Sequence, residues 1–263
     1  MNCGAGTRRS VSDDVPAHPT DEQSPADPDL VAFSDLARAA YCPRQCYYAR
    51  ADDDRGVPSE VAATVELAHR YPALREAADL DGEPIAVSPA TYRDRLDTLA
   101  DRPVWSALAN PPERDLYLAG KDCHGIAHKL LPGVAVAGDD SATDSDTDTT
   151  QTPPVPVIVS PGAPHETGVW EPQSVRAVAA AKALAWERER EIPRALVEYP
   201  AHAVVRSVRL GVRRTAAYRR ALRTARGIDG PPPRLRDSPR CEPCEYREEC
   251  GVETKSLRSR LGL

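Results

Sequence analysis

The chain has 263 residues, a formal net charge of -6 and 41% hydrophobic residues. This length allows one α/β domain with a sizeable core, or two small domains. The acidic balance argues against a general nucleic-acid binder, because such proteins use Lys and Arg to displace phosphate counterions. The 34 basic residues, however, comprise only four Lys beside 30 Arg, in a chain rich in Asp and Ala. We interpret this composition as that of a salt-adapted protein, in which an acidic surface serves solubility and local basic clusters are informative.

The sequence shows no membrane or export signal. No window holds 18 or more apolar residues, and residues 1–10 lack the apolar core of a signal peptide. We therefore expect a cytoplasmic protein without membrane contact. Seven cysteines in a reducing compartment favour metal ligands or buried thiols over a disulfide framework.

Composition also divides the chain. Residues 1–28 are rich in Ser, Asp and Pro with few large apolar side chains, which predicts a disordered tail. Residues 138–154 form a polar, acidic insertion that we also expect to be disordered. Between and around it, residues 29–252 are expected to form one domain, followed by a C-terminal tail at 253–263.

The first predicted element is a helix from Phe33 to Arg50. Ser34 is its candidate N-cap, and a short apolar stripe follows at helical spacing. Pro43 is awkward inside a helix, so we expect a break or a restart near Cys42.

A second helix is predicted from Ser59 to Ala78, with Pro72 as a kink or boundary. Short apolar runs then predict strands. These runs are Pro84–Val87, Leu116–Leu118, Gly125–Leu131 and Val155–Val159.

The last third alternates helices and strands. Helical spacing recurs from Pro172 to Glu189, strand patterns follow at 195–199 and 203–210, and a basic helix is predicted from Thr215 to Arg226. Strands alternating with long helices predict a mixed α/β domain.

Three cysteines near the C-terminus form a compact group, Cys241-x2-Cys244-x5-Cys250. Thiolates at such spacing can converge on one soft metal centre. A fourth ligand is needed, and Cys42 is the best candidate, with Cys46 as the alternative. Spacing alone does not distinguish an iron-sulfur cluster from zinc, or from thiols that bind nothing. Cys3 and Cys123 are most simply spare thiols.

Motifs at both ends of the chain then resemble a known family. The matching residues are Phe33-Ser34-x-Leu36, Tyr41-Cys42-Pro43-Arg44-x-Cys46-x-Tyr48, His69, Pro231-Pro232 and Cys241-x2-Cys244-x-Tyr246-Arg247-x2-Cys250. Together they resemble the CRISPR-associated protein four family of RecB-like PD-(D/E)XK nucleases, over about residues 30–252 without the acidic insertion.

The resemblance implies a mixed central sheet flanked by helices, with a C-terminal iron-sulfur cysteine segment. One N-terminal and three C-terminal cysteines would hold a 4Fe-4S cluster, which assigns Cys42, Cys241, Cys244 and Cys250 as ligands. Characterised members trim DNA ends during spacer acquisition, so DNA and CRISPR adaptation proteins are the implied partners.

The catalytic positions that the resemblance implies are altered in this chain. Cleavage on this fold needs carboxylates that hold Mg or Mn at the phosphate, a Lys two residues after the second carboxylate, and often an upstream His. His69 matches the upstream His, although a lone helical His is by default a surface or capping residue. The carboxylate and lysine positions fall on His128, Ile158 and Ser160. In the helix from Pro172, the stretch Val175–Ala180 that should supply a Gln contains none, so we expect a degenerate nuclease centre.

Other carboxylates leave the enzyme question open. Asp122, Glu166 and Glu171 could replace the lost ligands, although acidic side chains near loops are by default solvated. In that case the chain would be an active single-stranded DNA exonuclease that uses Mg or Mn.

A basic stripe lies near the end of the predicted domain. Eight arginines occur between Arg206 and Arg226, including Arg213, Arg214, Arg219, Arg220 and Arg223. Arginine forks suit phosphate oxygens, so the stripe favours nucleic-acid binding, while surface ion pairing is the alternative.

These observations lead to one interpretation and two alternatives. The interpretation is an iron-sulfur, nucleic-acid-binding protein on a nuclease-like fold that has lost its catalytic metal site. The alternatives are the active exonuclease and a structural iron-sulfur or zinc protein with no role on nucleic acid.

Overall fold

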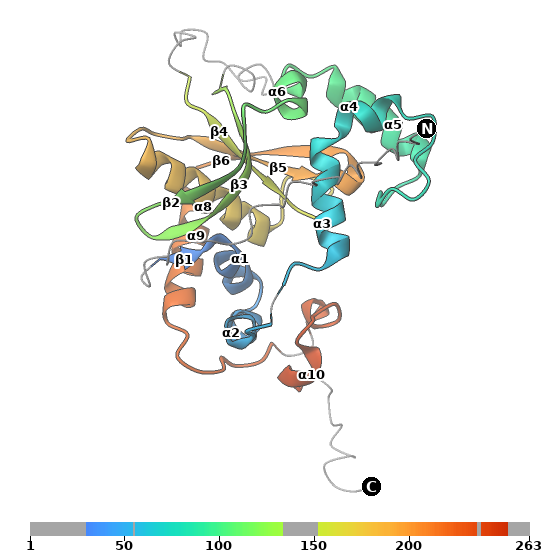
Figure 1. The fold of residues 1–263 in the computed structure, drawn as a ribbon. Helices are drawn as coiled ribbons and strands as arrows, with labels where there is room; N and C mark the ends of the chain where they lie inside the picture. Colours follow the sequence, from blue (N-terminus) through green and yellow to red (C-terminus); the bar gives the residue numbers. More distant parts are fainter. Residues whose placement is uncertain (1–29, 55, 134–151, 236–237, 252–263) are drawn as a thin grey trace, which may run out of the picture.

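The protein has a mixed α/β fold with helices on both faces of an open sheet (Figure 1). The structure is a computed structural model and describes residues 30–54, 56–133, 152–235 and 238–251. Six strands form the sheet in the order β1-β3-β4-β5-β6, with β2 paired to the other edge of β3. The strands are β1 (Val31–Ala32), β2 (Glu113–Ala119), β3 (Cys123–Leu131), β4 (Val155–Val159), β5 (Arg194–Tyr199) and β6 (Val204–Arg209).

The central strands are joined by a helical crossover. Strands β4 and β5 run parallel, and the helix α8 (Glu171–Glu187) connects them. The other long pairings, β2 with β3, β3 with β4 and β5 with β6, are antiparallel. All five residues of β4 are buried, as expected for a central strand covered on both faces.

Four helices lie on one side of the sheet. They are α1 (Phe33–Tyr41), α2 (Pro43–Ala51), α8 and α9 (Val212–Arg226). Helices α1, α8 and α9 contact strands, and α2 packs on α1 and α9. Alanines make α8 narrow, so it lies close against the sheet; a Cβ added to Gly120 would come within 2.7 Å of the Ala183 backbone. Ile158 belongs to the core on this face.

The opposite face carries a layer of short helices, visible at the upper right of Figure 1. They are α3 (Ser59–Glu66), the 3-10 helix η1 (Leu67–His69), α4 (Tyr71–Glu76), α5 (Pro89–Ala100) and α6 (Trp105–Ala109). Their apolar side chains pack on Val157, Val159 and Leu196 to form a second core. The 3-10 helix η3 (Pro200–His202) joins β5 to β6.

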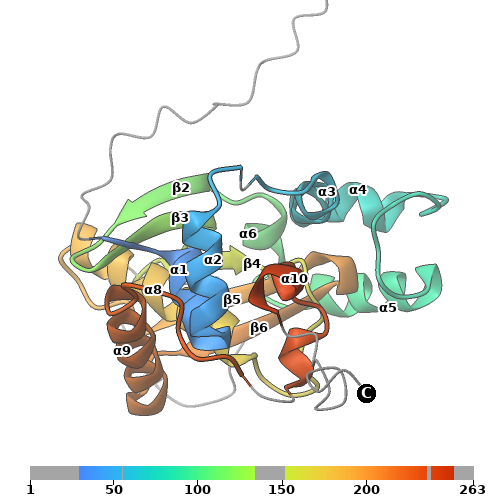
Figure 2. The same ribbon diagram turned by 90° about the horizontal axis from the view of Figure 1, so that it is seen from below.

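The C-terminal segment contains the 3-10 helix η4 (Pro239–Cys241) and the short helix α10 (Arg247–Cys250). Figures 1 and 2 both show this segment beside α2, and in Figure 1 it lies away from the sheet. The first and last described parts of the chain are therefore neighbours in space.

Several predicted elements are confirmed with adjusted ends. The break at Cys42 is real: its backbone is extended, and it separates α1 from α2 because a residue before proline disfavours the helical region. The predicted helix at 59–78 is divided, and Pro72 lies in the first turn of α4, where its missing N–H is harmless. The strands at 155–159, 195–199 and 203–210 and the helices at 172–189 and 215–226 correspond to β4, β5, β6, α8 and α9.

Two local predictions are wrong. Ser34 is not the N-cap of α1, because Ala32 occupies that position without a side-chain hydrogen bond. Residues 84–87 form no strand. Only three residues lie between Pro84 and Ser88, the N-cap of α5, which is too few for a strand. Ala86 N makes an isolated hydrogen bond to Ala201 O. The predicted tails at 1–28 and 253–263, and residues 138–151 of the predicted insertion, lie outside the described residues. In the described part, no helix is long and apolar enough to cross a membrane.

Candidate functional site

Cys42 lies at the junction of two helices that point toward the C-terminal segment. Its extended backbone ends α1, and Pro43 starts α2. Cys42 N donates to Arg38 O, and Cys42 O accepts from Cys46 N, so the backbone of this junction is satisfied on both sides. The thiol of Cys42 is half-buried and uncommitted to any disulfide.

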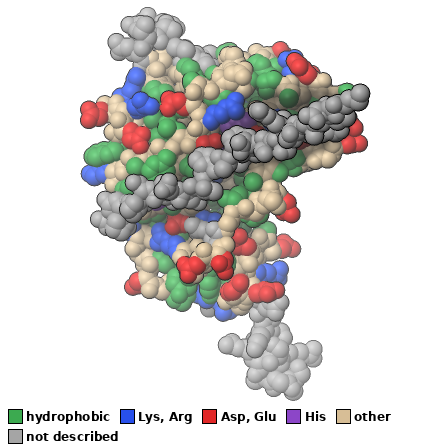
Figure 3. All heavy atoms as spheres, in the orientation of Figure 1, with side chains coloured by type: hydrophobic (Ala, Val, Ile, Leu, Met, Phe, Trp, Pro, Cys, Tyr) green, Lys and Arg blue, Asp and Glu red, His purple; other side chains and the backbone are tan. Residues whose placement is uncertain are grey.

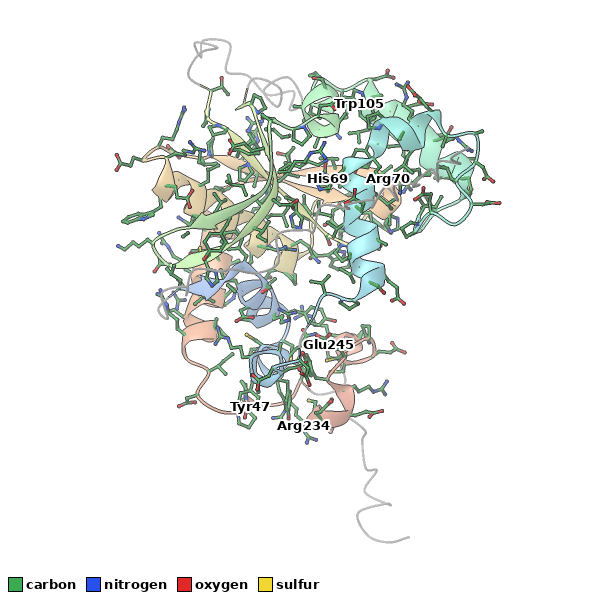
Figure 4. All side chains as sticks on the ribbon, in the orientation of Figure 1. Tyr47, His69, Arg70, Trp105, Arg234 and Glu245 are labelled. Atoms are coloured by element: carbon green, nitrogen blue, oxygen red, sulfur yellow. The ribbon has the colours of Figure 1, made fainter. Side chains whose placement is uncertain are left out.

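Reciprocal hydrogen bonds hold the C-terminal segment against this junction. Tyr41 Oη donates to Arg240 O at 2.9 Å, and Arg240 Nη1 donates back to Tyr41 O at 2.7 Å. Arg44 Nη1 donates to Pro232 O at 2.7 Å, and Tyr48 Oη donates to Glu249 O at 3.2 Å. Side chains from both ends therefore bond to backbone carbonyls of the other end. In Figure 4, Tyr47, Arg234 and Glu245 lie together in this lower region, far from Trp105.

Four thiols line one cavity at this junction. Cys42 lies on one side, and the C-terminal segment contributes the rest. Burial is the largest cause that raises the pKa of the Cys244 thiol. The charges of Cys42, Cys250 and Cys241 raise this pKa further, so all three thiols lie near Cys244. The sulfurs are therefore electrostatic neighbours, and removing their protons together requires a cation.

The remaining described cysteines stand apart. Cys46 Sγ is buried and donates to Asp35 O at 3.5 Å. Cys123 lies in the core between α8 and α9, where Tyr218 Oη donates to its sulfur. Burial raises the pKa of Cys123 to about 11, which suits an inert thiol. Cys3 lies outside the described residues.

The four thiols suit a soft metal centre. The cavity between them is large enough for a 4Fe-4S cluster only if the C-terminal segment moves. Among the described residues, no three His, Cys, Asp or Glu side chains are arranged to hold a single metal ion. A cubane spreads its thiolates farther apart than one tetrahedral ion does, because each sulfur binds a different iron. The cavity of about 20 Å³ holds roughly one water and is smaller than a cubane. Neither hydrophobic core includes a described residue of the segment, which is held by hydrogen bonds to α1 and α2, so accommodating a cubane would require these hydrogen bonds to rearrange.

Two of the predicted degenerate nuclease positions lie on β3 and β4, and the third, Ser160, directly follows β4. Lys129 pairs with Val157 in the antiparallel register, so His128 and Ile158 are opposite each other. Ile158 is fully buried, and Ser160, two residues on, is 3% exposed. His128 Nδ1 accepts a hydrogen bond from Val159 N at 3.2 Å. None of these three residues carries a carboxylate.

His69 lies beside this group at the end of η1. Figure 4 shows it between α3 and the sheet, and its charge acts on His128. Burial, then Lys129 and Arg114, lower the pKa of His69 to about 4. Its Nδ1 atom is buried without a hydrogen-bond partner. His69 is therefore more than a solvated surface residue.

The alternative carboxylates are dispersed. Asp122 pairs with Arg226 at 3.0 Å, and Glu171 pairs with Arg220 at 2.6 Å. Glu166 is exposed in the loop after β4. Because Asp122 precedes β3, Glu171 begins α8 and Glu166 lies in a loop, the described structure does not bring these three together as metal ligands.

The predicted basic stripe lies largely on α9. Arg213, Arg219 and Arg223 are exposed and have no ion pair among the described residues. Arg220 is exposed but paired with Glu171. Arg214 is half-buried and donates to Arg209 O. On the face shown in Figure 3, acidic and basic side chains are interspersed, and no large patch of one sign stands out among the described atoms.

Two polar features escaped the sequence analysis. Lys129 and Glu198 form a fully buried ion pair with Nζ and Oε1 2.9 Å apart. Arg176 on α8 donates from Nη1 to Val159 O at 3.2 Å, next to His128. The motif Gly-x-x-His128-Lys129 contained the first signal, since a Lys inside an apolar strand needs a buried partner.

Comparison with protein-family models finds no matching family, and comparison with curated proteins finds no matching relative.

Proposed function

We propose that this chain binds a 4Fe-4S cluster through Cys42, Cys241, Cys244 and Cys250. It would be a nucleic-acid-binding protein of the CRISPR-associated RecB-like nuclease type, without the divalent-metal chemistry of that type. The main support is that the first and last cysteine blocks, 199 residues apart between Cys42 and Cys241, line one cavity.

Soft-ligand chemistry favours a cluster over a hard cation. Among the described residues, the cavity is lined by four thiols and by no carboxylate, and sulfur ligands select iron-sulfur clusters, zinc or copper. A bound cluster would tie the two ends of the domain covalently and close a loop of about 200 residues. Tyr41, Arg44 and Tyr48 already align the junction with the segment, so the cysteines are held near one another before any iron binds.

The lack of cleavage chemistry follows from the residues on β3 and β4. Mg requires near-octahedral oxygen coordination that carboxylates anchor. His128 is a poor ligand for Mg, Ile158 has no lone pair, and Ser160 lacks the charge that would stabilise an attacking hydroxide. DNA contact is proposed for α9, where Arg213, Arg219 and Arg223 are free to contact phosphates. CRISPR adaptation proteins remain the proposed protein partners.

The cluster is tested by anaerobic purification with iron, sulfide and zinc analysis. We expect about four irons and matching sulfide per chain. Cys244→Ser should lose most of this iron, while the matched control Cys46→Ser should keep it, because Cys46 points to Asp35 O. Stoichiometric zinc without sulfide would replace the cluster proposal with the structural zinc alternative.

The nucleic-acid role is tested with single-stranded DNA at several salt concentrations. Replacing Arg213, Arg219 and Arg223 by Glu should weaken binding and reduce the salt slope by about 0.7 for each lost phosphate contact. Arg75→Glu in the distant helical layer is the control. Absence of wild-type affinity at low salt would reject the proposal. Degradation of DNA with Mg or Mn that disappears in Asp122, Glu166 or Glu171 variants would favour the active nuclease.

A further inference from the structure

Strands β3 and β4 stop pairing next to His128. Their last register pair at this end is Lys129 with Val157. Two residues along β4, Val159 N donates to the His128 side chain, and Val159 O accepts from Arg176 Nη1. The side chains of His128 and Arg176 therefore bond the backbone N–H and C=O of Val159. Their polar groups lie where β3 and β4 separate.

This group contains buried polar atoms without partners. Arg176 Nε and His69 Nδ1 are buried and make no hydrogen bond. A buried polar atom without a partner costs on the order of 1–3 kcal/mol, so such a cluster calls for a ligand. His69, His128 and Arg176 are each only half-buried as whole residues, which leaves them reachable from solvent.

The charge around the group has one sign. Burial lowers the pKa of His128 well below its usual range, and Arg176, His69 and Lys129 lower it further. Burial and Arg38 lower the pKa of Arg176 to about 10. For His69 the charges that act are Lys129 and Arg114. No described carboxylate shifts the pKa of any of the three.

At neutral pH the side chains of Arg176, His128 and His69 can each donate a hydrogen bond. Arg176 stays charged at neutral pH, while both imidazoles are neutral. Because His128 Nδ1 accepts from Val159 N, its proton lies on Nε2, which is left as a donor. The group therefore combines one guanidinium with imidazole N–H donors and offers no anionic oxygen.

We propose that Arg176, His128 and His69 form a binding site for an oxyanion of the phosphate class that requires no divalent metal. A guanidinium fork bonds phosphate oxygens directly, and neutral N–H donors add to it at low dielectric. By contrast, two carboxylates at positions 128 and 158 would repel a phosphate unless a metal ion lay between them and the phosphate. The phosphate can come from a free phosphate compound or from a nucleic-acid backbone; only the second source rests on the proposed function.

Calorimetric titration in the presence of a chelator tests the site with inorganic phosphate and with single-stranded oligothymidylate. We expect Arg176→Gln to bind phosphate ~10- to 100-fold more weakly, the cost of a charge-assisted hydrogen bond. Arg75→Gln, exposed and distant, should bind it like the wild type. Unchanged affinity in Arg176→Gln would overturn the proposal. Phosphate binding without oligothymidylate binding would leave the oxyanion site standing and remove the nucleic-acid source.

A second measurement needs no variant, since Arg176→Gln also loses the bond to Val159 O and could fold poorly. In the wild type, the imidazole resonances are followed by NMR against pH with and without phosphate. A bound oxyanion should raise the pKa of His69 and His128, because negative charge offsets Arg114, Lys129 and Arg176 around them. Identical titrations with and without phosphate would reject the site.

Discussion

Removing the ammonium of Lys129 should destabilise the protein strongly. Lys129 and Glu198 are both 0% exposed. Lys129 Nζ donates to Glu198 Oε1, to Ala68 O at 2.6 Å and to Leu108 O at 2.9 Å, so all three of its donors are used. Lys129→Met keeps the length of the side chain but leaves a buried carboxyl and two carbonyls without their donor.

Breaking a buried pair from one side costs about 3–5 kcal/mol. With a urea m-value of about 2–3 kcal/mol/M, the unfolding midpoint should fall by roughly 1–2 M. Burial already raises the pKa of Glu198, although Lys129 opposes this. Without Lys129 that pKa rises further, so the folded variant binds more protons than the unfolded one. Its free energy of unfolding should therefore decrease as pH rises above the unfolded Glu pKa, and its deficit should shrink in acid.

Urea unfolding at pH 5 and pH 8 measures both effects. The matched control is Arg75→Met, which breaks the exposed pair with Asp97 and should cost less than about 1 kcal/mol. The double variant Lys129→Met, Glu198→Leu should recover part of the loss, since no charge remains buried. A loss below about 1 kcal/mol in Lys129→Met, or a deficit independent of pH, would refute this account of the ion pair.

Two further predictions concern the sheet and its histidine. The pKa of His69 is lowered from 6.5 to about 4 in the folded protein, so the unfolded state binds more protons in this interval; the free energy of unfolding should fall from pH 6.5 toward pH 4. His69→Gln should show a shallower pH dependence in urea unfolding, and an equal slope would contradict the assignment. Gly125→Ala should cost about 1–3 kcal/mol, because Gly125 has φ +152° and a Cβ there would lie 2.6 Å from the Phe33 ring. Gly230→Ala, with no atom within 4 Å of the new Cβ, is its near-neutral control in the same assay.

The sequence predicted those helices and strands whose ends are set by residues adjacent in the chain. Pro43 forces Cys42 out of the helical region, so the break between α1 and α2 could be predicted. The continuous apolar run 155–159 predicted a strand that is covered on both faces, and β4 is buried throughout. Helix α5 was missed although Tyr92, Leu96 and Leu99 recur at helical spacing and are buried. Strand β1 has only two residues, and its pairing with β3 depends on distant contacts that no local pattern contains.

The candidate site also contains features that local sequence predicted and features that depend on distant contacts. Spacing grouped Cys241, Cys244 and Cys250 as ligands of a soft metal but left Cys46 open as an alternative to Cys42 for the fourth thiol, and the family resemblance assigned Cys42. The Lys129–Glu198 pair joins residues 69 positions apart across three strands, so only the sheet register reveals it. No local sequence pattern assigned a role to Arg176. Its role emerges only from the separation of β3 and β4, which leaves Val159 O for its guanidinium.

Restoring the three nuclease residues should not by itself restore cleavage. His128→Asp, Ile158→Glu and Ser160→Lys would place two carboxylates beside Arg176, in a position that is fully buried at Ile158. Arginine remains charged, so it would pair with these carboxylates and repel a divalent ion. We therefore expect the triple variant to bind no Mn in calorimetric titration and to leave DNA intact. Adding Arg176→Gln removes the competing cation and should allow Mn binding if the fold tolerates the buried charges. Mn-dependent cleavage by the triple variant with Arg176 in place would show that this arginine does not control the centre.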